Sequence, residues 1–261
     1  MLAALWISKT GLNAQDLSLS TISNNLANIS TTGFKKDRAN FEDLLYQIKR
    51  QPGGLSTADT RLPSGLQIGS GVRVVGTEKI FTQGDMDVTD NTLDVAIQGD
   101  GFFRVQMPDG SIGYTRDGSF QLDSDGNIVT SDGYLLDPEI NVANATQITI
   151  GTNGDVEVVL NGDTANPQVA GTIQISTFVN PAGLQAVGNN LFKETAASGA
   201  PNDGAPGDDG FGTTSQGMLE SSNVNAAEEL VKLITTQRAY EMNSKVVSTA
   251  DEMLSYVTQQ L

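Results

Sequence analysis

At 261 residues the chain is long enough for one large domain or two modest ones. Its 15 Lys and Arg against 31 Asp and Glu give a formal net charge of -16, which argues against nucleic acid, because such binding depends on cations that neutralise phosphates. The sequence has no His and no Cys, which excludes a Ser-His-Asp triad, a His- or Cys-ligated zinc site, thiolate chemistry and disulfides.

The charge is divided unevenly along the chain. Residues 1–50 hold six basic and four acidic side chains, whereas residues 100–220 hold 16 acidic and three basic ones, a balance of -13. The ends and the middle are therefore expected to lie in different surroundings. No secretory signal is predicted, because the apolar start at residues 1–7 has no basic segment before it and no cleavage site after it. We expect a cytosolic protein unless an export route that reads no cleaved signal takes it out.

The first predicted element is a helix over residues 1 to about 32. Apolar side chains recur there every seven residues, with two more at three-residue offsets, which is the a/d pattern of a helix that packs along a partner. The members of this stripe are Leu5, Leu12, Leu19, Leu26, Ile22 and Ile29. Gly33 is the expected C-cap, because glycine accepts the left-handed conformation that ends a helix.

Residues 37–92 are predicted to form an extended connector. Within it, residues 41–48 have the pattern of a short helix, and residues 72–81 alternate like a strand. The stretch between them, residues 51–71, is rich in Gly, Pro and Ser, which favours turns and irregular backbone.

The middle of the chain, residues 93–217, is predicted to be an all-β domain. Asp-Gly pairs at 109–110, 117–118, 125–126 and 132–133 have the spacing of hairpin turns and predict a meander of strands near 102–107, 119–122, 127–130 and 134–136. Further strands are expected over 147–150, 156–160 and 172–178, with Asn-Gly turns at 153–154 and 161–162. Residues 198–217, rich in Gly and Pro, are expected to be an irregular surface connection.

The last predicted element is a helix that begins near Asn225, because Asn225 and Glu228 have the spacing of a capping box. A second stripe with seven-residue spacing follows and comprises Leu233, Tyr240, Val247 and Leu254. The predicted fold class is therefore mixed. The N- and C-terminal α-helices, in residues 1–36 and 218–261, form a coiled-coil-like assembly domain, and the central domain is all-β.

The two stripes admit two interpretations. An apolar stripe at helical spacing is most often the core face of a globular helix. Here, however, the stripes lie at the two ends of the chain, outside a β domain that needs no helical cover, and a helix alone is poorly ordered without partners. The stripe residues are therefore the predicted subunit interface of an assembly.

No motif predicts catalysis. Residues 123–127 resemble a calcium loop only faintly, because the spacing of an EF-hand fails, and the Gly-rich stretches at 69–71 and 99–101 do not complete a nucleotide-binding loop. A glycosidase-like carboxylate pair has few aromatic side chains to help it bind sugars, since the chain has one Trp and five Tyr. We expect neither an enzyme nor a cofactor or metal site.

Several segments resemble the flagellar rod and hook axial proteins. Residues 27–35 (ANISTTGFK) are similar to the N-terminal signature of that family, residues 93–105 and 114–122 to its central motifs, and residues 218–224 (MLESSNV) and 233–254 to its C-terminal helix. Residues 51–71 resemble the connector of the distal rod branch. The family-motif residues are Asn28, Gly33, Phe34, Gly99, Gly101, Phe102, Asn223, Asn225, Gln237, Arg238 and Tyr240.

This resemblance implies a non-enzymatic structural subunit that polymerises into a hollow rod and transmits torque from motor to hook. It implies export through the flagellar type III apparatus without a cleaved signal peptide, and a place in the periplasm-spanning basal body of the bacterial flagellum. The implied partners are further copies of the chain, proximal rod subunits, the hook protein, the P and L ring proteins, the rod cap and the export apparatus.

Two alternatives stay open. The first is a proximal rod or hook subunit of the same family. The second is a secreted, adhesin-like β module whose terminal coiled coil only trimerises it. A closed trimer keeps a fixed mass as concentration rises, whereas a rod subunit polymerises, because a head-to-tail contact that does not close makes a filament.

Overall fold

A computed structural model describes residues 2–53, 63–160 and 167–259. The chain forms two compact units. The helical unit comprises Met1–Leu26, Asp37–Glu78 and Asn225–Leu261, and the β unit comprises Ala27–Lys36 and Lys79–Val224. The chain therefore passes between the units four times, at residues 26–27, 36–37, 78–79 and 224–225.

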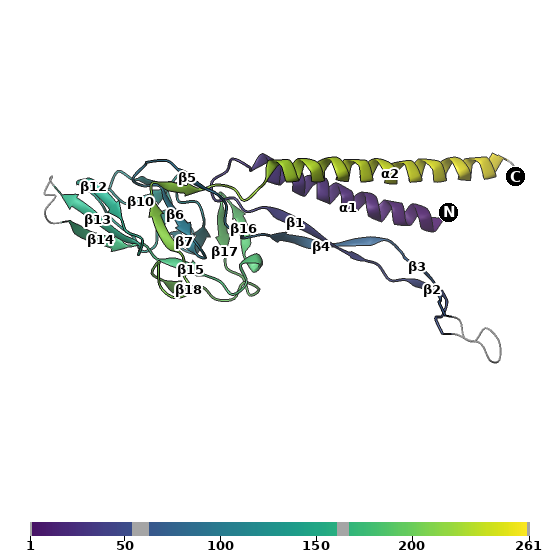
Figure 1. Cartoon of the computed structure of the whole chain (residues 1–261), viewed down its shortest axis with the longest axis horizontal. Coiled ribbons are helices and arrows are strands. Elements are labelled where there is room, and N and C mark those ends of the chain that lie inside the picture. The colour runs from purple at the N-terminus through teal and green to yellow at the C-terminus, as the bar shows by residue number, and fades with distance from the viewer. Residues whose placement is uncertain (1, 54–62, 161–166, 260–261) are drawn as a thin grey trace. The chain divides into compact units, whose positions relative to one another are not determined.

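Two long helices dominate the helical unit: α1 (Leu2–Ala27) and α2 (Ala226–Gln259). They lie side by side in Figure 1 with both chain ends at the same end of the pair, so they are antiparallel. The predicted start of α2 is confirmed, because Asn225 Oδ1 accepts hydrogen bonds from the backbone N–H groups of Ala227 (3.0 Å) and Glu228 (3.2 Å). The predicted end of the first helix is too late, since α1 stops at Ala27. In the described part of the chain, neither helix is long and apolar enough to cross a membrane.

The helical unit also contains two strand pairs. Strand β1 (Asp37–Asp43) pairs with β4 (Val72–Lys79), and β2 (Gln47–Arg50) pairs with β3 (Leu66–Ile68). The strand expected over residues 72–81 is confirmed as β4, but the helix expected over residues 41–48 is wrong. The returning strands supply cross-strand partners, including the ion pairs Arg73–Glu42 (2.7 Å) and Arg38–Glu78 (3.0 Å), and this pairing overrides the local helical pattern.

The β unit is built on a nine-stranded sheet in which β16, β17, β8, β7, β11, β10 and β9 follow one another, and β15 joins β7 to β18. The bounds of these strands are β7 Phe102–Gln106, β8 Ile112–Thr115, β9 Phe120–Leu122, β10 Ile128–Thr130, β11 Leu135–Leu136, β15 Ile175–Thr177, β16 Gln185–Gly188, β17 Leu191–Lys193 and β18 Asn202–Gly204. A three-stranded sheet contains β12 (Ala145–Ile150), β13 (Asp155–Leu160) and β14 (Gln168–Thr172). Two further pairs join β6 (Val95–Gln98) to β19 (Thr213–Gln216) and β5 (Met86–Val88) to β20 (Met218–Glu220).

Three of the four Asp-Gly pairs form the expected hairpins: β7–β8, β9–β10 and β10–β11. The prediction is wrong at Asp117-Gly118, because β8 and β9 are not neighbours and β11 returns to pair with β7 instead. Gly118 serves a different purpose. Its carbonyl accepts a hydrogen bond from Val95 N (3.0 Å), and a Cβ on it would lie 1.7 Å from Val95 O, so only glycine fits.

Most of the remaining strand predictions are confirmed. Strands β12 and β13 lie where residues 147–150 and 156–160 were expected to be extended, and Gly154 makes the turn between them with φ +84°. The Asn-Gly turn expected at 161–162 lies outside the described residues. The run at 172–178 is divided between the end of β14 and β15, and the irregular connection expected over 198–217 is wrong where β18 and β19 form.

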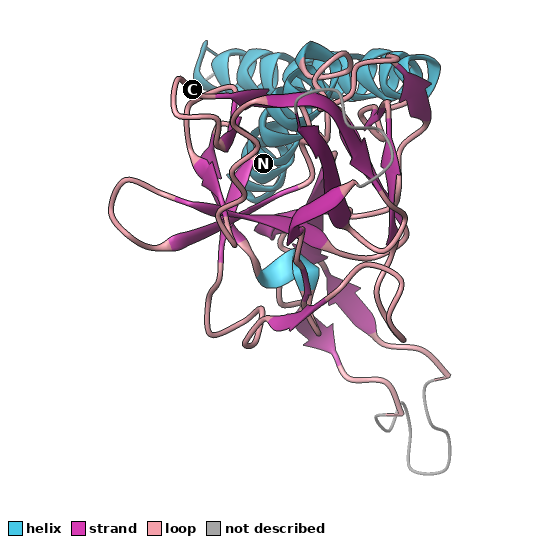
Figure 2. Cartoon of the chain, turned by 90° about the vertical axis from the view of Figure 1, so that its left-hand side faces the viewer, coloured by secondary structure: helices cyan, strands magenta, loops and turns pink. Residues whose placement is uncertain are grey.

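The β unit has a closed core of its own. Its main cluster contains Phe103, Ile97, Val105, Ile128, Leu136, Ile140, Val156, Ile173 and Ile175, all buried. A second cluster is aromatic and joins Phe102, Tyr114, Phe178 and Phe192, with edge-on ring contacts. Figure 2 colours the many strands of the chain magenta, and the short turn Pro181–Gly183 is the helical element that the described part of the β unit contains. The β unit thus buries its apolar side chains in a core of its own.

Candidate assembly surface

Small residues form the face of α1 that packs against α2. Ser8, Gly11 and Ala14 recur at three-residue intervals, and Ile22 and Asn25 follow eight and eleven positions after Ala14; all but Gly11 are buried. A Cβ on Gly11 would lie 3.1 Å from Asn243 Nδ2 of α2, so the two helices approach closely at this level. Small side chains allow this close approach.

A set of hydrogen-bonded polar side chains joins α1 to α2 at one end of the helix pair. Asn25 Nδ2 donates to Glu229 Oε2 (3.3 Å) and to the carbonyl of Asp37 (2.9 Å), and Asn25 Oδ1 accepts from Asp37 N (2.8 Å). Lys232 Nζ donates to the other oxygen of Glu229 (2.9 Å). Asn25 and Glu229 are both buried, so these bonds fix α1, the start of β1 and α2 to one another. The sequence analysis did not predict these hydrogen bonds, although Asn25, a polar residue next to the apolar stripe residue Leu26, was a signal for them.

The predicted stripe residues are mostly covered within the chain itself. Those that are half-buried are Leu5, Leu12, Leu19, Leu26, Leu233, Val247 and Leu254. Ile22 is buried, Tyr240 is 40% exposed, and Ile29 is half-buried in the turn that follows α1. Their role as a contact between copies stays a prediction.

A second set of apolar side chains on α2 is exposed. This outer apolar face consists of Leu230, Val231, Ile234, Met242, Val246, Met253 and Tyr256. Part of this face lines an open hollow of about 570 Å³ between α1 and α2, whose lining residues are Ala4, Met242, Lys245, Val246, Thr249, Ala250 and Met253. Exposed apolar patches of this kind mark interaction sites. From the sequence, Val246 and Met253 of this face read only as a widening of the covered stripe, because the spacing of the outer apolar face is less regular.

In the β unit, the family-motif residues gather around a buried ion cluster of Lys35, Glu220 and Arg116. Lys35 Nζ lies 2.6 Å from Glu220 Oε1, and both side chains are 0% exposed. Arg116 Nη1 lies 3.4 Å from Glu220 Oε2. Lys35 Nζ also donates to Thr82 O (2.8 Å), and Gly84 N donates to Glu220 Oε1 (2.9 Å). All three lie in segments that resemble the family motifs, but none of them was among the predicted site residues.

Glycine at position 33 brings the N-terminal motif onto this cluster. Gly33 has φ +67°, as expected of a left-handed residue, but it lies beyond the helix end and is not a C-cap. A Cβ on Gly33 would lie 2.7 Å from the carbonyl carbon of Arg116, and Gly33 N donates to Glu220 O (2.7 Å). The residue is therefore required for close backbone approach.

Other motif residues complete the surroundings of Arg116. Gly99 O accepts a hydrogen bond from Arg116 Nη2 (2.8 Å), and the guanidinium carbon lies 5.4 Å from the centre of the Phe102 ring. Gly101 has φ +146°, and a Cβ there would lie 2.9 Å from the side chain of Ile175. These contacts explain why the central motif carries two glycines and an aromatic residue at this place.

Asn223 links three segments of the β unit. Its Oδ1 accepts from Lys36 N (2.8 Å), its Nδ2 donates to Ile80 O (2.7 Å), and its backbone N donates to Phe34 O (3.4 Å). Each of these segments lies next to a point where the chain passes to the helical unit. Asn25, in the helical unit, joins the segments on the other side of two of these passages, 36–37 and 224–225, and itself lies just before the passage at 26–27.

The remaining motif residues lie apart from the cluster. Asn28 Oδ1 accepts a hydrogen bond from Thr31 Oγ1 (3.2 Å) in the turn after α1. Asn225 caps α2. Gln237, Arg238 and Tyr240 lie on α2 and are exposed.

Burial governs the electrostatics of the ion cluster. Burial lowers the pKa of Lys35, an effect that the neighbouring Glu220 carboxylate opposes. Burial likewise lowers the pKa of Arg116, again against the attraction of Glu220. Two buried cations share one buried carboxylate, so the loss of that carboxylate leaves Lys35 without its ion-pair partner and Arg116 with only the weaker attraction of the exposed Asp100.

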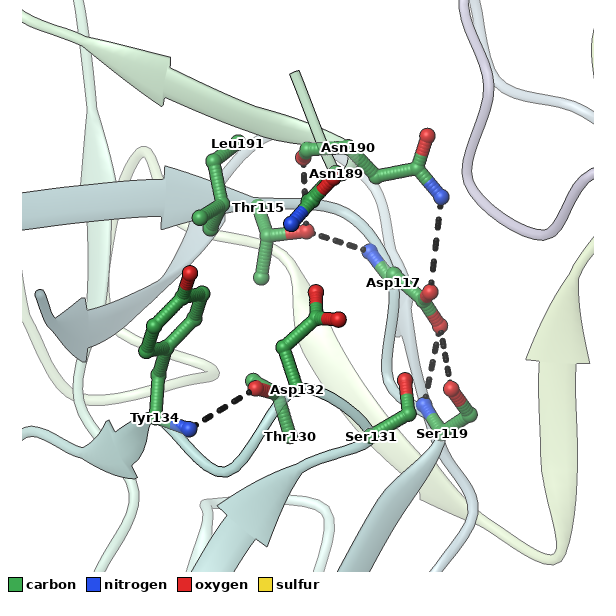
Figure 3. Close-up of a pocket in the computed structure, with 10 residues that line it drawn as sticks. All are labelled: Thr115, Asp117, Ser119, Thr130, Ser131, Asp132, Tyr134, Asn189, Asn190 and Leu191. Carbon is green, nitrogen blue, oxygen red and sulfur yellow. Dashed lines mark hydrogen bonds between the residues drawn. The ribbon is translucent and has the colours of Figure 1, made fainter. Parts of the chain in front are cut away.

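A polar pocket of about 210 Å³ adjoins the N-terminal motif (Figure 3). Thr115 Oγ1 donates to Asn190 O (2.9 Å), and Asn190 Nδ2 reaches Asp117 Oδ2 (3.4 Å). Asn190 Nδ2 also donates to Thr32 O (3.1 Å), so one wall of the pocket holds the motif segment. Across the described residues, no group of three or more acidic side chains is arranged to hold a metal ion.

Three family models match this chain, in order, over both helices and the β unit. Residues 5–35 match the model described as flagella basal body rod protein, residues 96–158 the flagellar hook protein FlgE/F/G D1 domain, and residues 215–260 the flagellar basal body rod FlgEFG protein C-terminal. Each matched region contributes one member of the ion cluster: Lys35, Arg116 and Glu220. The fold and its buried centre therefore define a flagellar rod or hook subunit.

Relatives that match over nearly their whole length show which family of rod or hook subunits the chain belongs to. The chain is 56% identical to a flagellar basal-body rod protein FlgG of Buchnera aphidicola subsp. Schizaphis graminum, over 99% of this chain and 100% of that protein. It is 50% identical to the FlgG protein of Borreliella burgdorferi over 97% of each chain, and 30% identical to the flagellar hook-basal body complex protein FlhP of Bacillus subtilis over 98% of each. The chain belongs to the FlgG family of flagellar basal-body rod proteins. It is a structural subunit of the basal body, and the resemblance found in the sequence is confirmed.

Proposed function

We propose that this chain polymerises, through its two terminal helices, into the hollow distal rod that transmits torque from the motor to the hook. The family relation supports a distal rod subunit over a hook subunit or an adhesin-like module. The observation that carries the assembly route is the outer apolar face of α2, which the chain itself leaves uncovered. Covering such a face contributes about 25 cal/mol for each Å² of apolar surface removed from water.

The assembly domain of this proposal consists of residues 1–36 and 218–261, with residues 37–92 as connector and 93–217 as outer β domain. Coiled-coil-like packing of α1 and α2 between copies would give every subunit the same surroundings along the rod. The β unit carries most of the acidic excess and has a closed core, so it suits the hydrated outer surface of a shaft that turns within rings.

Torque has to pass between the helical unit and the β unit of each subunit. The chain passes between them four times, and Asn25 and Asn223 join the passing segments on their two sides. Segments that are joined to one another share a load better than a single linker does. These bonds within each unit support the proposal that the subunit bears load.

Membership of the rod family supports the proposed partners: further copies of the chain, proximal rod subunits, the hook protein, the P and L ring proteins, the rod cap and the type III export apparatus. In this proposal the subunit has no cofactor and no catalytic role, and it leaves the cell without a cleaved signal peptide.

Electron microscopy of concentrated protein tests the proposal. The wild-type chain should form hollow tubes. Introducing charge on the outer apolar face, as in Met242→Asp with Met253→Asp, should abolish the tubes without changing the thermal unfolding of the β unit. The matched control is Ser244→Asp with Ser255→Asp, which adds the same charge to exposed polar positions of α2 and should leave the tubes intact.

Charge on the covered stripe, as in Val247→Asp or Leu254→Asp, should also abolish tubes, because it separates α1 from α2. Tubes formed by the Met242 and Met253 double variant would contradict the proposed assembly surface. A particle of fixed mass at all concentrations would instead favour a closed oligomer of the adhesin-like kind.

A further inference from the structure

The helical unit carries a knob and a hollow that cannot meet within one copy. The hollow of about 570 Å³ between α1 and α2 is lined on the α1 side by Ala4 and on the α2 side by the side chains of Val246, Thr249 and Met253, among others. The knob is Trp6, which is 59% exposed. It is the single tryptophan of the chain.

Helix geometry places Trp6 on the far side of α1 from the hollow. An α-helix has 3.6 residues per turn, so side chains two positions apart point about 160° away from each other. Ala4 lines the hollow, and Trp6 follows it by two positions. The chain therefore cannot fill its own hollow with Trp6, whereas another copy can.

We infer that Trp6 of one copy inserts into the hollow between α1 and α2 of the next copy. This inference rests on the proposed polymerisation and assigns the residues that make the contact. A knob and a hollow on opposite sides of one subunit form a heterologous contact, which continues from copy to copy and builds an open filament where the rotation between copies does not close a ring. The occupant is thus a second copy of this chain.

The chemistry of the two surfaces is complementary. The hollow is almost entirely apolar apart from Lys245, and an indole ring combines a large apolar surface with a face that attracts an ammonium group. Lys9 Nζ lies 5.5 Å from the centre of the Trp6 ring, so Lys9 accompanies Trp6 in the proposed contact. The exposed carboxylates of Glu241 and Glu252 adjoin the lining residues Met242 and Met253, so they offer Lys9 an opposite charge.

The single tryptophan makes a direct measurement possible on the unmodified chain. When the protein passes from monomer to tube, Trp6 emission should shift to shorter wavelength, and quenching by acrylamide should fall several-fold. Thr249→Phe places a ring in the hollow and should raise the concentration needed for tubes about tenfold, an effect equal to about 1.4 kcal/mol of contact energy. The control Ser248→Phe adds the same ring at the adjacent exposed position, which points about 100° away from Thr249 and does not line the hollow, and it should leave that concentration unchanged.

Cross-linking supplies a second measurement, because the chain has no cysteine of its own. Assembled tubes of Trp6→Cys mixed into Val246→Cys should give disulfide-linked dimers on oxidation, and a double variant with both changes should give a ladder of oligomers. The control pair Trp6→Cys with Ser248→Cys should give neither. Wild-type tubes in which Trp6 emission and quenching match those of the monomer would overturn the contact while leaving the rod function intact. A wild-type chain that never polymerises would overturn both.

Discussion

The two units differ in how far their apolar side chains are buried. The β unit buries them in a closed core of aliphatic and aromatic residues. The helical unit covers one face of α2 with α1 and leaves the outer apolar face in contact with water. The β unit therefore needs no partner to bury its core, whereas the helical unit exposes an apolar surface that a partner can cover. This difference indicates that assembly takes place through the helical unit.

Removal of the buried carboxylate should have the largest effect on the β unit. Glu220→Ala removes the buried carboxylate that Lys35 and Arg116 share, and we expect it to lower the free energy of unfolding of the β unit by about 3–5 kcal/mol. Urea denaturation followed by circular dichroism measures this loss.

A triple variant separates charge from packing at the same site. Lys35→Met, Arg116→Met and Glu220→Leu together replace the ions with apolar groups of similar size, and they should restore most of the lost stability. If Glu220→Ala alone unfolded at the wild-type urea concentration, the ion cluster would not hold the N-terminal motif on the β unit.

The two linking asparagines should have smaller effects that are confined to different units. Asn223→Ala leaves Lys36 N and Ile80 O without their partner and should cost the β unit about 1–3 kcal/mol. Asn25→Ala should cost a similar amount, but its effect should appear as faster amide exchange in α1 and α2. An equal loss of protection in both units for either variant would contradict their separation.

The smallest expected effect concerns alkaline pH. Burial raises the pKa of Tyr114 to about 12, from an ordinary value of 10.0. The folded β unit therefore holds this proton more tightly than the unfolded chain does, so its stability should fall as the pH rises from 10 towards 12. Tyr114→Phe should remove that part of the pH dependence in thermal unfolding measured between pH 9 and 11. An unchanged slope would show that the Tyr114 hydroxyl does not contribute.

Local patterns predicted those parts of the fold that local chemistry determines. The cap at Asn225 was confirmed because the capping bonds form within three residues of it. The Asp-Gly turns were confirmed at three hairpins for the same reason. The fourth, Asp117-Gly118, failed because Gly118 packs against Val95, a contact between segments that sequence spacing does not reveal.

The buried ion cluster was harder to predict, because it too depends on contacts between segments that are far apart in the sequence. Glu220 lies 185 positions from Lys35, and only the folded β unit brings them to 2.6 Å. The motif resemblance nevertheless contained Gly33, Gly99 and Asn223, which surround this pair. On α2, the regular seven-residue stripe marked the face that α1 covers, whereas the exposed face beside it has a less regular pattern.

Amide hydrogen exchange on the same protein, before and after polymerisation, tests the central claim most directly. We predict that residues of α1 and α2 exchange faster than the buried strands in the monomer and become strongly protected in the tube, while the buried strands of the β unit are protected equally in both. Protection gained only in the β unit, with the helices unchanged, would contradict assembly through the helical unit.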